Sequence, residues 1–460
     1  MADALLLSRL QFAWVVALHI LLPAFTVGLA AYIAVLEGVY FFTRREVFLR
    51  LSKFWLRIFA VSFGMGVASG IVMPFQFGTN WSRYADATAD VLGPLMAYEV
   101  LMAFFLEAGF LGVLLFGRER VPHWVHFFAG VMVAAGTLLS TFWILSANSW
   151  MQTPAGYEML DGRFVPQDWL RVVFNPSFPY RLVHTTMAFF ITTALVVIGV
   201  AAWHIRRGRH AEESLVMQKM GLGLLAVLVP LQILVGDLHG LNTLEHQPAK
   251  LAAMEANWQT QARMPLLLFA WPDEAAARNR FEVGVPVLGS LILGHDPNAV
   301  IRGLKEWPAE DRPPVAIPFF SFRLMVGIGV VMLALTVAGL ALWRRGRLAT
   351  ALSFQRLCIL AAPLGFVAVI AGWVTTEVGR QPWVVYGLLR TRDAVTPSLG
   401  TQDVAVSLLV YVLAYVVIFG GGLTFMARLV RRGFAPDAAL EPRAPAATPA
   451  RPLSGATRVR

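Results

Sequence analysis

The side chains best able to do chemistry in this sequence lie inside long apolar runs. Ionisable and metal-ligating residues are costly at membrane depth unless they are paired or functional, so these few positions indicate where the function should be sought. They are His19, Glu99, Glu107, His126, His184, Arg323 and Glu377.

Four residues are candidate iron ligands because of their type and position. His184 and Met325 stand near the start of their apolar runs, Glu377 ends one, and His19 lies a turn or two inside another. Imidazole, thioether and carboxylate all bind haem iron. His opposite Met gives a saturated, electron-transferring haem, whereas a weak or replaceable ligand leaves the iron open to oxygen. The set predicts a haem protein with both kinds of site, which is what a reductase needs.

Taken singly, these residues have simpler explanations. A His within a span is more often a hydrogen-bond partner between helices, and a Met is more often core packing. His126 lies at the start of its apolar run, near the end predicted below to be cytoplasmic. It is therefore expected to be an interfacial or hydrogen-bonded histidine. Arg323 stands two residues before Met325, where its charge would neutralise a haem propionate.

Glu99 and Glu107 are eight residues apart in one apolar run. On a continuous α-helix they would differ by about 80° in azimuth and about 12 Å in height. Two acids at different depths of one span are typical of a proton relay.

The composition excludes an ordinary soluble protein. Hydrophobic residues make up 57% of the 460 residues and charged residues only 14%, against roughly 45–50% and about 25% in soluble domains. The formal net charge of +10 comes with Arg and Lys clustered between apolar runs, which indicates membrane orientation and not a nucleic-acid partner. The single Cys358 leaves no intrachain disulfide.

The apolar runs predict an all-α, polytopic bundle of about nine transmembrane spans. They lie near residues 12–40, 54–77, 93–117, 125–147, 184–205, 218–237, 318–343, 356–377 and 404–427. The first run is too long for a secretory signal, and we interpret it as a retained span. Arg and Lys concentrate in the connections after spans one, three, five, seven and nine, which places the amino terminus outside and the carboxyl terminus in the cytoplasm.

The chain outside the spans divides into two long outer segments and a tail. The segments cover residues 147–183 and 238–317, and the second is large enough to bind a substrate. Residues 435–460 are rich in Ala, Pro and Arg and are expected to form a disordered cytoplasmic tail. Residues 1–434 would then form the haem-binding bundle.

Six segments, in order along nearly the whole chain, resemble subunit I of the cytochrome bd-type quinol oxidases. They are Ser8-Arg9-Leu10-Gln11-Phe12, Phe75-Gln76-Phe77-Gly78-Thr79-Asn80-Trp81, Met102-Ala103-Phe104-Phe105-Leu106-Glu107, Ala147-Asn148-Ser149-Trp150-Met151-Gln152, Lys250-Leu251-Ala252-Ala253-Met254-Glu255 and Gly379-Arg380-Gln381-Pro382-Trp383.

The resemblance implies a terminal oxidase that oxidises membrane quinol at the outer face and reduces dioxygen to water. His184 and Met325 would be the axial ligands of a low-spin haem b, and His19 and Glu377 would each serve one of two further haems. Trp373, one turn before Glu377, would contact the haems or anchor the bundle. Lys250 and Glu255 would belong to the quinol-binding loop, here within residues 238–317.

The resemblance also implies a proton path and partners. Glu107 and then Glu99 would lead cytoplasmic protons to the oxygen site, so a gradient forms without a pump. The expected location is the bacterial inner membrane, with a second large membrane subunit, subunit II. A very small single-span subunit is left open. The type of quinol and the response to cyanide are also left open. The expected haems are a low-spin haem b, a high-spin haem b, and a third that is either haem d or a further high-spin haem b. The short loop, His239 and residues 242–247 resemble the cyanide-insensitive branch.

Two other functions compete with the oxidase. Intramembrane acids and a His would also suit a proton-coupled transporter, which predicts broken helices near the midplane and an inverted repeat. No such repeat is visible in the sequence. A haem subunit that passes electrons from quinol to a protein would need His184 and Met325, but not His19, Glu377 or the acidic span.

Overall fold

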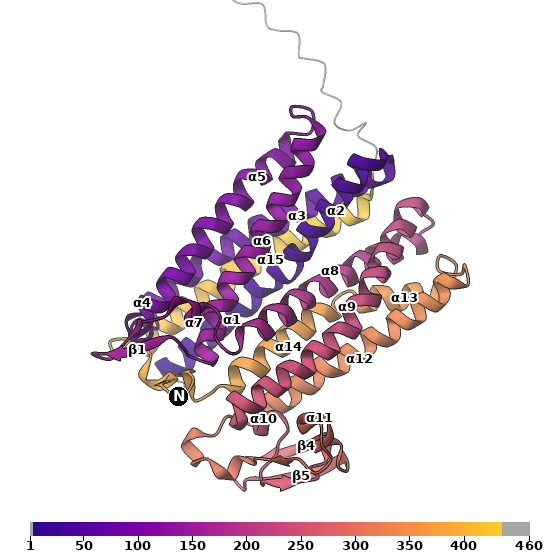
Figure 1. Cartoon of the computed structure of the whole chain (residues 1–460). Helices are drawn as coiled ribbons and strands as arrows, with labels where there is room; N and C mark the ends of the chain where they lie inside the picture. Colours follow the sequence, from indigo (N-terminus) through magenta and orange to yellow (C-terminus); the bar gives the residue numbers. More distant parts are fainter. Residues whose placement is uncertain (1–2, 435–460) are drawn as a thin grey trace, which may run out of the picture.

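A bundle of long helices forms the body of the protein in the computed structural model, which describes residues 3–434 (Figure 1). Within these residues, nine helical segments are long and apolar enough to cross a membrane. The all-α, nine-span prediction is therefore confirmed, and the chain is a multi-pass membrane protein. The expected tail, residues 435–460, lies outside the described residues.

The chain as far as the end of the fifth span contains eight α-helices and one π-helix, of which only α7 lies outside the spans. They are α1 (Ala4–Leu21), α2 (Pro23–Thr43), α3 (Glu46–Thr79), α4 (Ser82–Tyr98), the π-helix (Glu99–Ala103), α5 (Phe104–Phe116), α6 (His123–Gln152), the short α7 (Trp169–Val173) and α8 (Phe178–Arg206). The later helices are α9 (Ala211–His246), α10 (Pro248–Met254), α11 (Leu288–Gly294), α12 (Ala316–Arg344), α13 (Leu352–Ala361), α14 (Leu364–Gly379) and α15 (Thr401–Arg432).

Two spans consist of two helices each, and a proline stands at each junction. Pro23 opens α2 directly after α1, and Pro363 precedes α14. Proline has no backbone N–H and its ring clashes with the preceding turn, so it interrupts the helical hydrogen bonds. The apolar pattern continues across both junctions, which is why each pair appears as one span in the sequence.

Helix α8 lies at the centre of the bundle. It packs against α2, α6, α9, α13 and α14, and many of its apolar residues are buried, with Leu195 and Ile198 at 0% exposure. Close approach depends on glycine: a Cβ at Gly28 of α2 would lie 2.4 Å from Thr193 Oγ1 of α8. By contrast, α15 keeps a row of exposed apolar side chains that suits contact with lipid or another subunit.

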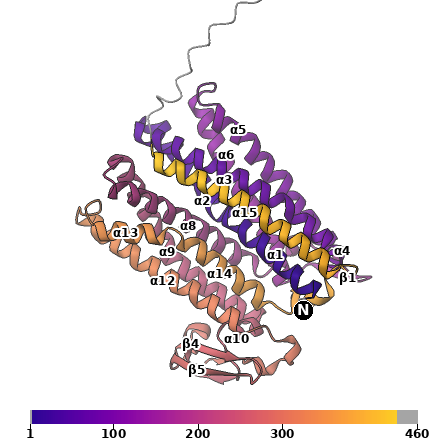
Figure 2. The ribbon, with the colours of Figure 1, turned by 180° about the vertical axis from the view of Figure 1, so that it is seen from behind.

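The β-strands gather at one end of the bundle, which we call the hairpin end (Figures 1 and 2). The strands form four two-stranded sheets: β1 (Tyr157–Leu160) with β2 (Arg163–Pro166), β3 (Gln261–Ala262) with β6 (Val300–Ile301), β4 (Leu266–Asp273) with β5 (Arg278–Val285), and β7 (Trp383–Val385) with β8 (Leu389–Arg390). Short 3₁₀ helices cover Leu304–Glu306, Ala309–Asp311 and Thr391–Asp393.

The long segment expected from residue 238 begins later than the hydropathy indicates. Helix α9 continues to His246 and so includes His239. Polar residues in these last turns end the apolar run without ending the helix, because at the hairpin end they pack against other protein segments. Asn242, for example, donates a hydrogen bond to the Pro176 carbonyl at 3.2 Å.

Candidate functional site

His19 is held in a fixed orientation on α1. Its Nδ1 lies 2.9 Å from Oγ of Ser69 on α3, and Ser69 is fully buried. A hydrogen bond at Nδ1 fixes the ring and leaves Nε2 for a metal, as in most metal-binding histidines. A Cβ at Gly70 would lie 3.1 Å from the ring, so glycine gives the imidazole its room.

His184 stands near the start of α8 with an unsatisfied ring nitrogen. Its Nδ1 is buried and has no hydrogen-bond partner among the described residues. Gly236 of α9 faces the ring, and the ring of His239, also on α9, lies 5.5 Å away between centroids. A buried polar atom without a partner is costly in a finished core, so this imidazole is suited to binding a group that the chain itself does not supply.

Met325 lies on α12 against α14. A Cβ at Gly372 would come within 2.8 Å of the Met325 sulfur, so only glycine permits this approach. Trp373 follows on α14 and is half-buried. The sulfur is thus directed toward the helix that also carries Trp373 and Glu377.

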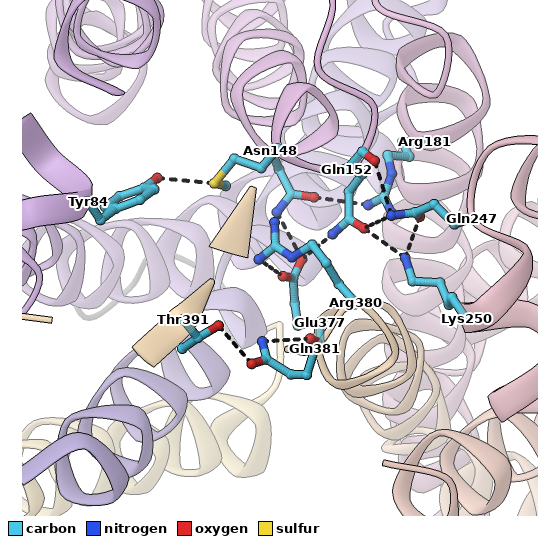
Figure 3. A network of polar contacts seen from close by, with 11 residues as sticks. Tyr84, Asn148, Gln152, Arg181, Gln247, Lys250, Glu377, Arg380, Gln381 and Thr391 are labelled. Carbon is cyan, nitrogen blue, oxygen red and sulfur yellow. Dashed lines mark hydrogen bonds and ion pairs between the residues drawn. The ribbon is translucent and has the colours of Figure 1, made fainter. Parts of the chain in front are cut away.

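Glu377 is the centre of a buried hydrogen-bond network at the hairpin end (Figure 3). Its Oε1 accepts hydrogen bonds from Asn148 Nδ2 at 3.0 Å and Gln152 Nε2 at 3.2 Å, while Oε2 is paired with Arg380. Asn148 in turn accepts from Arg181 NH1 at 3.0 Å. The carboxylate is therefore oriented by two amides of α6 and by the guanidinium of Arg380, the residue after α14.

Lys250 joins the same network from α10. Its Nζ donates to Gln152 Oε1 and to Gln247 Oε1, each at 2.7 Å (Figure 3). Burial, together with the positive charge of Arg181, holds the pKa of Lys250 well below its usual range, although Glu377 opposes the shift. A lysine with a lowered pKa can accept a proton.

Positive charge is in excess in this network. Arg181 and Arg380 are both buried, at 6% exposure, and their two charges outnumber the one carboxylate of Glu377. Arg181 Nε, Arg380 Nε and Arg380 NH1 have no hydrogen-bond partner among the described residues. Buried cations need compensation, so the network is suited to an anionic group with several acceptor oxygens.

Arg323 of α12 is bound by groups of the segment that follows α9. It is paired with Glu255 at 2.9 Å, and it donates to the carbonyls of Leu267 at 2.8 Å and Met254 at 2.7 Å. Its hydrogen bonds are thus directed to the loop that follows α9. Glu255 and Lys250 also have separate partners, because Glu255 is bound by α12 and Lys250 by Gln152 of α6.

The two acids of the third span face the same neighbouring helix. Glu99 accepts a hydrogen bond from Ser140 Oγ of α6 at 2.7 Å, and a Cβ at Gly136 of α6 would lie 2.8 Å from Glu107 Cγ. The π-helix between them inserts extra residues into the turn. It thereby removes the azimuthal difference that a regular α-helix would give, so both carboxyls are directed toward α6.

Sequence reasoning missed another buried acid, Glu37 of α2. It is 3% exposed, is paired with Arg118, and lies 3.0 Å from Nδ1 of His126. His126 is hydrogen-bonded on both nitrogens, with Leu114 O 3.1 Å from Nε2, as its prediction required. The available signal was an acid inside the first apolar run. The partners Asn148, Gln152, Arg181 and Gln247 were also missed, because a polar residue near the end of a span looks solvated in the sequence.

The residues at the hairpin end of the bundle are suited to binding haem. Haem needs axial ligands with a free donor atom, small residues beside a flat ring, and cations for its two carboxylates. His19, His184 and Met325 each carry a donor atom and each stand against a glycine. The unsatisfied N–H groups of Arg181 and Arg380 match the carboxylates.

The fold and this site together define a membrane-embedded redox protein, and comparisons with known proteins identify its family. The family model for cytochrome bd terminal oxidase subunit I matches residues 7–434, so the chain belongs to that family. It functions in a terminal oxidase, an enzyme of the quinol:oxygen oxidoreductase class that uses haem cofactors.

Individual relatives match over almost their full length. The chain is 32% identical to cytochrome bd-II ubiquinol oxidase subunit 1 of Escherichia coli (strain K12), over 94% of this chain and 97% of the relative. It is 34% identical to cytochrome bd ubiquinol oxidase subunit 1 of Bacillus subtilis (strain 168), over 93% and 94%. The solved bd oxidase from Geobacillus thermodenitrificans superposes with a TM-score of 0.86 at 30% identity, covering 94% of this chain and 99% of that one.

The family assignment decides among the three functions considered from the sequence. It supports the oxidase over the proton-coupled transporter and over a subunit that passes electrons to a protein. The roles of individual residues are a separate matter.

Proposed function

We propose that this chain is the haem-bearing catalytic subunit of a terminal oxidase that oxidises membrane quinol at the hairpin end and reduces dioxygen to water there. The observation that carries the proposal is the buried network around Glu377. An oriented carboxylate, two buried arginines with unsatisfied N–H groups and Lys250 surround one place. This combination suits a redox cofactor with carboxylates beside a proton-accepting site.

His184 and Met325 would hold a low-spin haem b, and His19 and Glu377 would each serve one of two further haems. One of these is a high-spin haem b, and the other is haem d or another high-spin haem b. When bound, the haems would supply electron transfer and oxygen binding. The protein orients the ligands: Ser69 directs His19, while Asn148, Gln152 and Arg380 direct Glu377.

The quinol would bind beside α10, between Glu255 and Lys250. Arg323 fixes the Glu255 carboxylate at 2.9 Å, and the lowered pKa of Lys250 favours the neutral amine, which can accept a proton. The two groups would take the two hydroxyl protons of the quinol. Relatives are named both ubiquinol and menaquinol oxidases, so the quinone ring of the substrate is left open.

The Arg-rich connections indicate how the protein is oriented in the membrane, and the acids of the third span indicate how protons would reach the oxygen site. The Arg-rich connections 44–53, 118–120 and 206–219 lie at the end opposite the hairpin end, so the hairpin end with the amino terminus would be outside. Protons would enter past Glu107 and then Glu99, and the charge separation would need no pump. We expect the protein to lie in the bacterial inner membrane.

Partners are expected on the lipid-facing helices. Membership in the family implies a second large membrane subunit, subunit II. The exposed apolar sides of α3, α5 and α15 offer it surface. A small single-span subunit would need similar apolar surface.

The test is the reduced-minus-oxidised visible spectrum of the purified complex, with and without carbon monoxide. His184→Ala should remove the low-spin b band and keep the carbon-monoxide-sensitive component, and His19→Ala should do the reverse. His123→Ala, an exposed histidine at the opposite end, is the control and should match wild type. Identical spectra for all three variants would refute the ligand assignment. A separate band at longer wavelength than the b-type bands would indicate haem d.

A further inference from the structure

The β4–β5 hairpin carries an apolar face that the protein leaves uncovered. Trp271 is 58% exposed, Val283 57% and Phe269 44%, and Val285 is also exposed. Patches of this kind on a protein surface mark contact with a partner or a membrane.

Strand register places Phe269, Val283 and Val285 on one face. Phe269 pairs with Val283 and Leu266 with Val285 across the two strands. A bulge between Leu267 and Phe269 resets the alternation, so the buried residues of β4 are Leu267, Ala270 and Pro272 and the exposed ones stand between them.

The inner face of the hairpin belongs to the protein core. Leu267 and Ala270 pack with Trp258 and Phe319, and the Leu267 carbonyl accepts the hydrogen bond from Arg323. Trp258 Nε1 donates to Asn279 of β5 at 2.7 Å. The hairpin is therefore fixed against α12, and its outer face has a fixed direction.

The outer face is continuous with the lipid-facing side of α12. The rings of Phe269 and Trp271 each lie 6.0 Å from the ring of Phe320. Phe320 is four residues into α12, so it stands only about 6 Å along the helix from its start. Ile317 and Leu324, on the same helix, are exposed at 53% and 51%.

Figure 1 agrees with this position. The hairpin lies beside the ends of α9 and α12 and extends to one side of the bundle. An aromatic and aliphatic surface at the level of the first turns of a span coincides with the boundary between headgroups and hydrocarbon, where Trp is enriched.

We propose that the outer face of the β4–β5 hairpin contacts lipid at the surface of the bilayer. This contact would anchor the loop that carries Glu255 to the membrane. The occupant of this face is lipid and not a protein partner. Because Arg323 joins the hairpin to Glu255, lipid contact would also hold that carboxylate beside α12.

The test measures contact with lipid directly in the assembled enzyme. Cys358, the only cysteine of the chain, is buried, so Val283→Cys and, separately, Val285→Cys introduce one reactive thiol each. Both are labelled with a nitroxide in nanodiscs, and collision with oxygen is compared with collision with a water-soluble nickel chelate. Glu310→Cys, at an exposed site of the same outer segment, is the matched control, and enzyme without an added cysteine gives the background.

Lipid contact predicts that oxygen collisions dominate at positions 283 and 285 and that nickel accessibility is several-fold lower than at position 310. Nickel accessibility equal to that at position 310 would overturn the proposal. Low accessibility to both probes would overturn it too, because it would show a protein partner on this face. The readout does not depend on catalytic activity, so it stands apart from the proposed function.

Discussion

Arg323 of α12 holds the Glu255 carboxylate at 2.9 Å, with side-chain exposures of only 17% and 2%. The pair joins a membrane span to the loop after α10, and two further hydrogen bonds from Arg323 to backbone carbonyls surround it. A guanidinium with several of its donors used in this way is a fixed support for the carboxylate.

Removing one partner of this pair should be worse than removing both. Arg323→Met leaves Glu255 buried and unpaired, which costs about 3–5 kcal/mol, and quinol oxidation should fall with it. The double variant Arg323→Met with Glu255→Leu should recover part of the apparent Tm but not the activity. Thermal unfolding of the purified complex, measured beside quinol oxidation, checks this. A double variant whose loss equals the sum of the two single losses would show that the pair is not coupled.

Met325→Leu should weaken the low-spin b band of the reduced-minus-oxidised spectrum, because leucine keeps the volume and lacks the thioether that binds iron. The carbon-monoxide-sensitive component should remain. Met332→Leu, two turns further along α12 and buried, is the matched control with the same chemical change. If both variants keep the band, Met325 is core packing.

Glu107→Gln should slow oxygen reduction on the order of 10²-fold at saturating quinol, because an amide cannot pass a proton. Ser140→Ala removes the hydroxyl 2.7 Å from Glu99 and should slow turnover several-fold. Thr141→Val is the control, since the Thr141 hydroxyl donates to Thr137 O of its own helix. Oxygen consumption together with proton uptake in liposomes measures the effect, and equal rates for the Ser140 and Thr141 variants would argue against the relay.

Lys250 should make stability depend on pH. Its pKa is lowered in the folded protein, whereas the unfolded chain keeps the proton up to about pH 10.4. The unfolded state therefore binds more protons between these two values, and the stability of the wild type rises with pH across that window. Lys250→Met should remove this rise in apparent Tm, and Lys305→Met, at an exposed lysine, should keep it. Parallel curves for wild type and Lys250→Met would contradict a lowered pKa.

The sequence alone determined the class of the molecule and the approximate position of each span. Hydropathy is a local property, because about 20 consecutive apolar residues are needed to cross a bilayer wherever the helix packs. The same reasoning brought out His19, His184 and Glu377, since a polar group among apolar neighbours is visible without knowledge of its partners. The order of the family segments predicted membership in the oxidase family, which the family comparison confirmed.

Only the tertiary structure decided which groups meet. Arg323 is bound to Glu255, and Glu377 is surrounded by residues of α6, α8 and α10 that are far apart in sequence. The π-helix at Glu99 likewise changes which side of the span faces α6. These relationships depend on helix rotation and on packing between distant segments, where a single inserted residue turns a helix by about 100°. The hydropathy along the chain locates the spans but does not name the distant residues that each helix face meets.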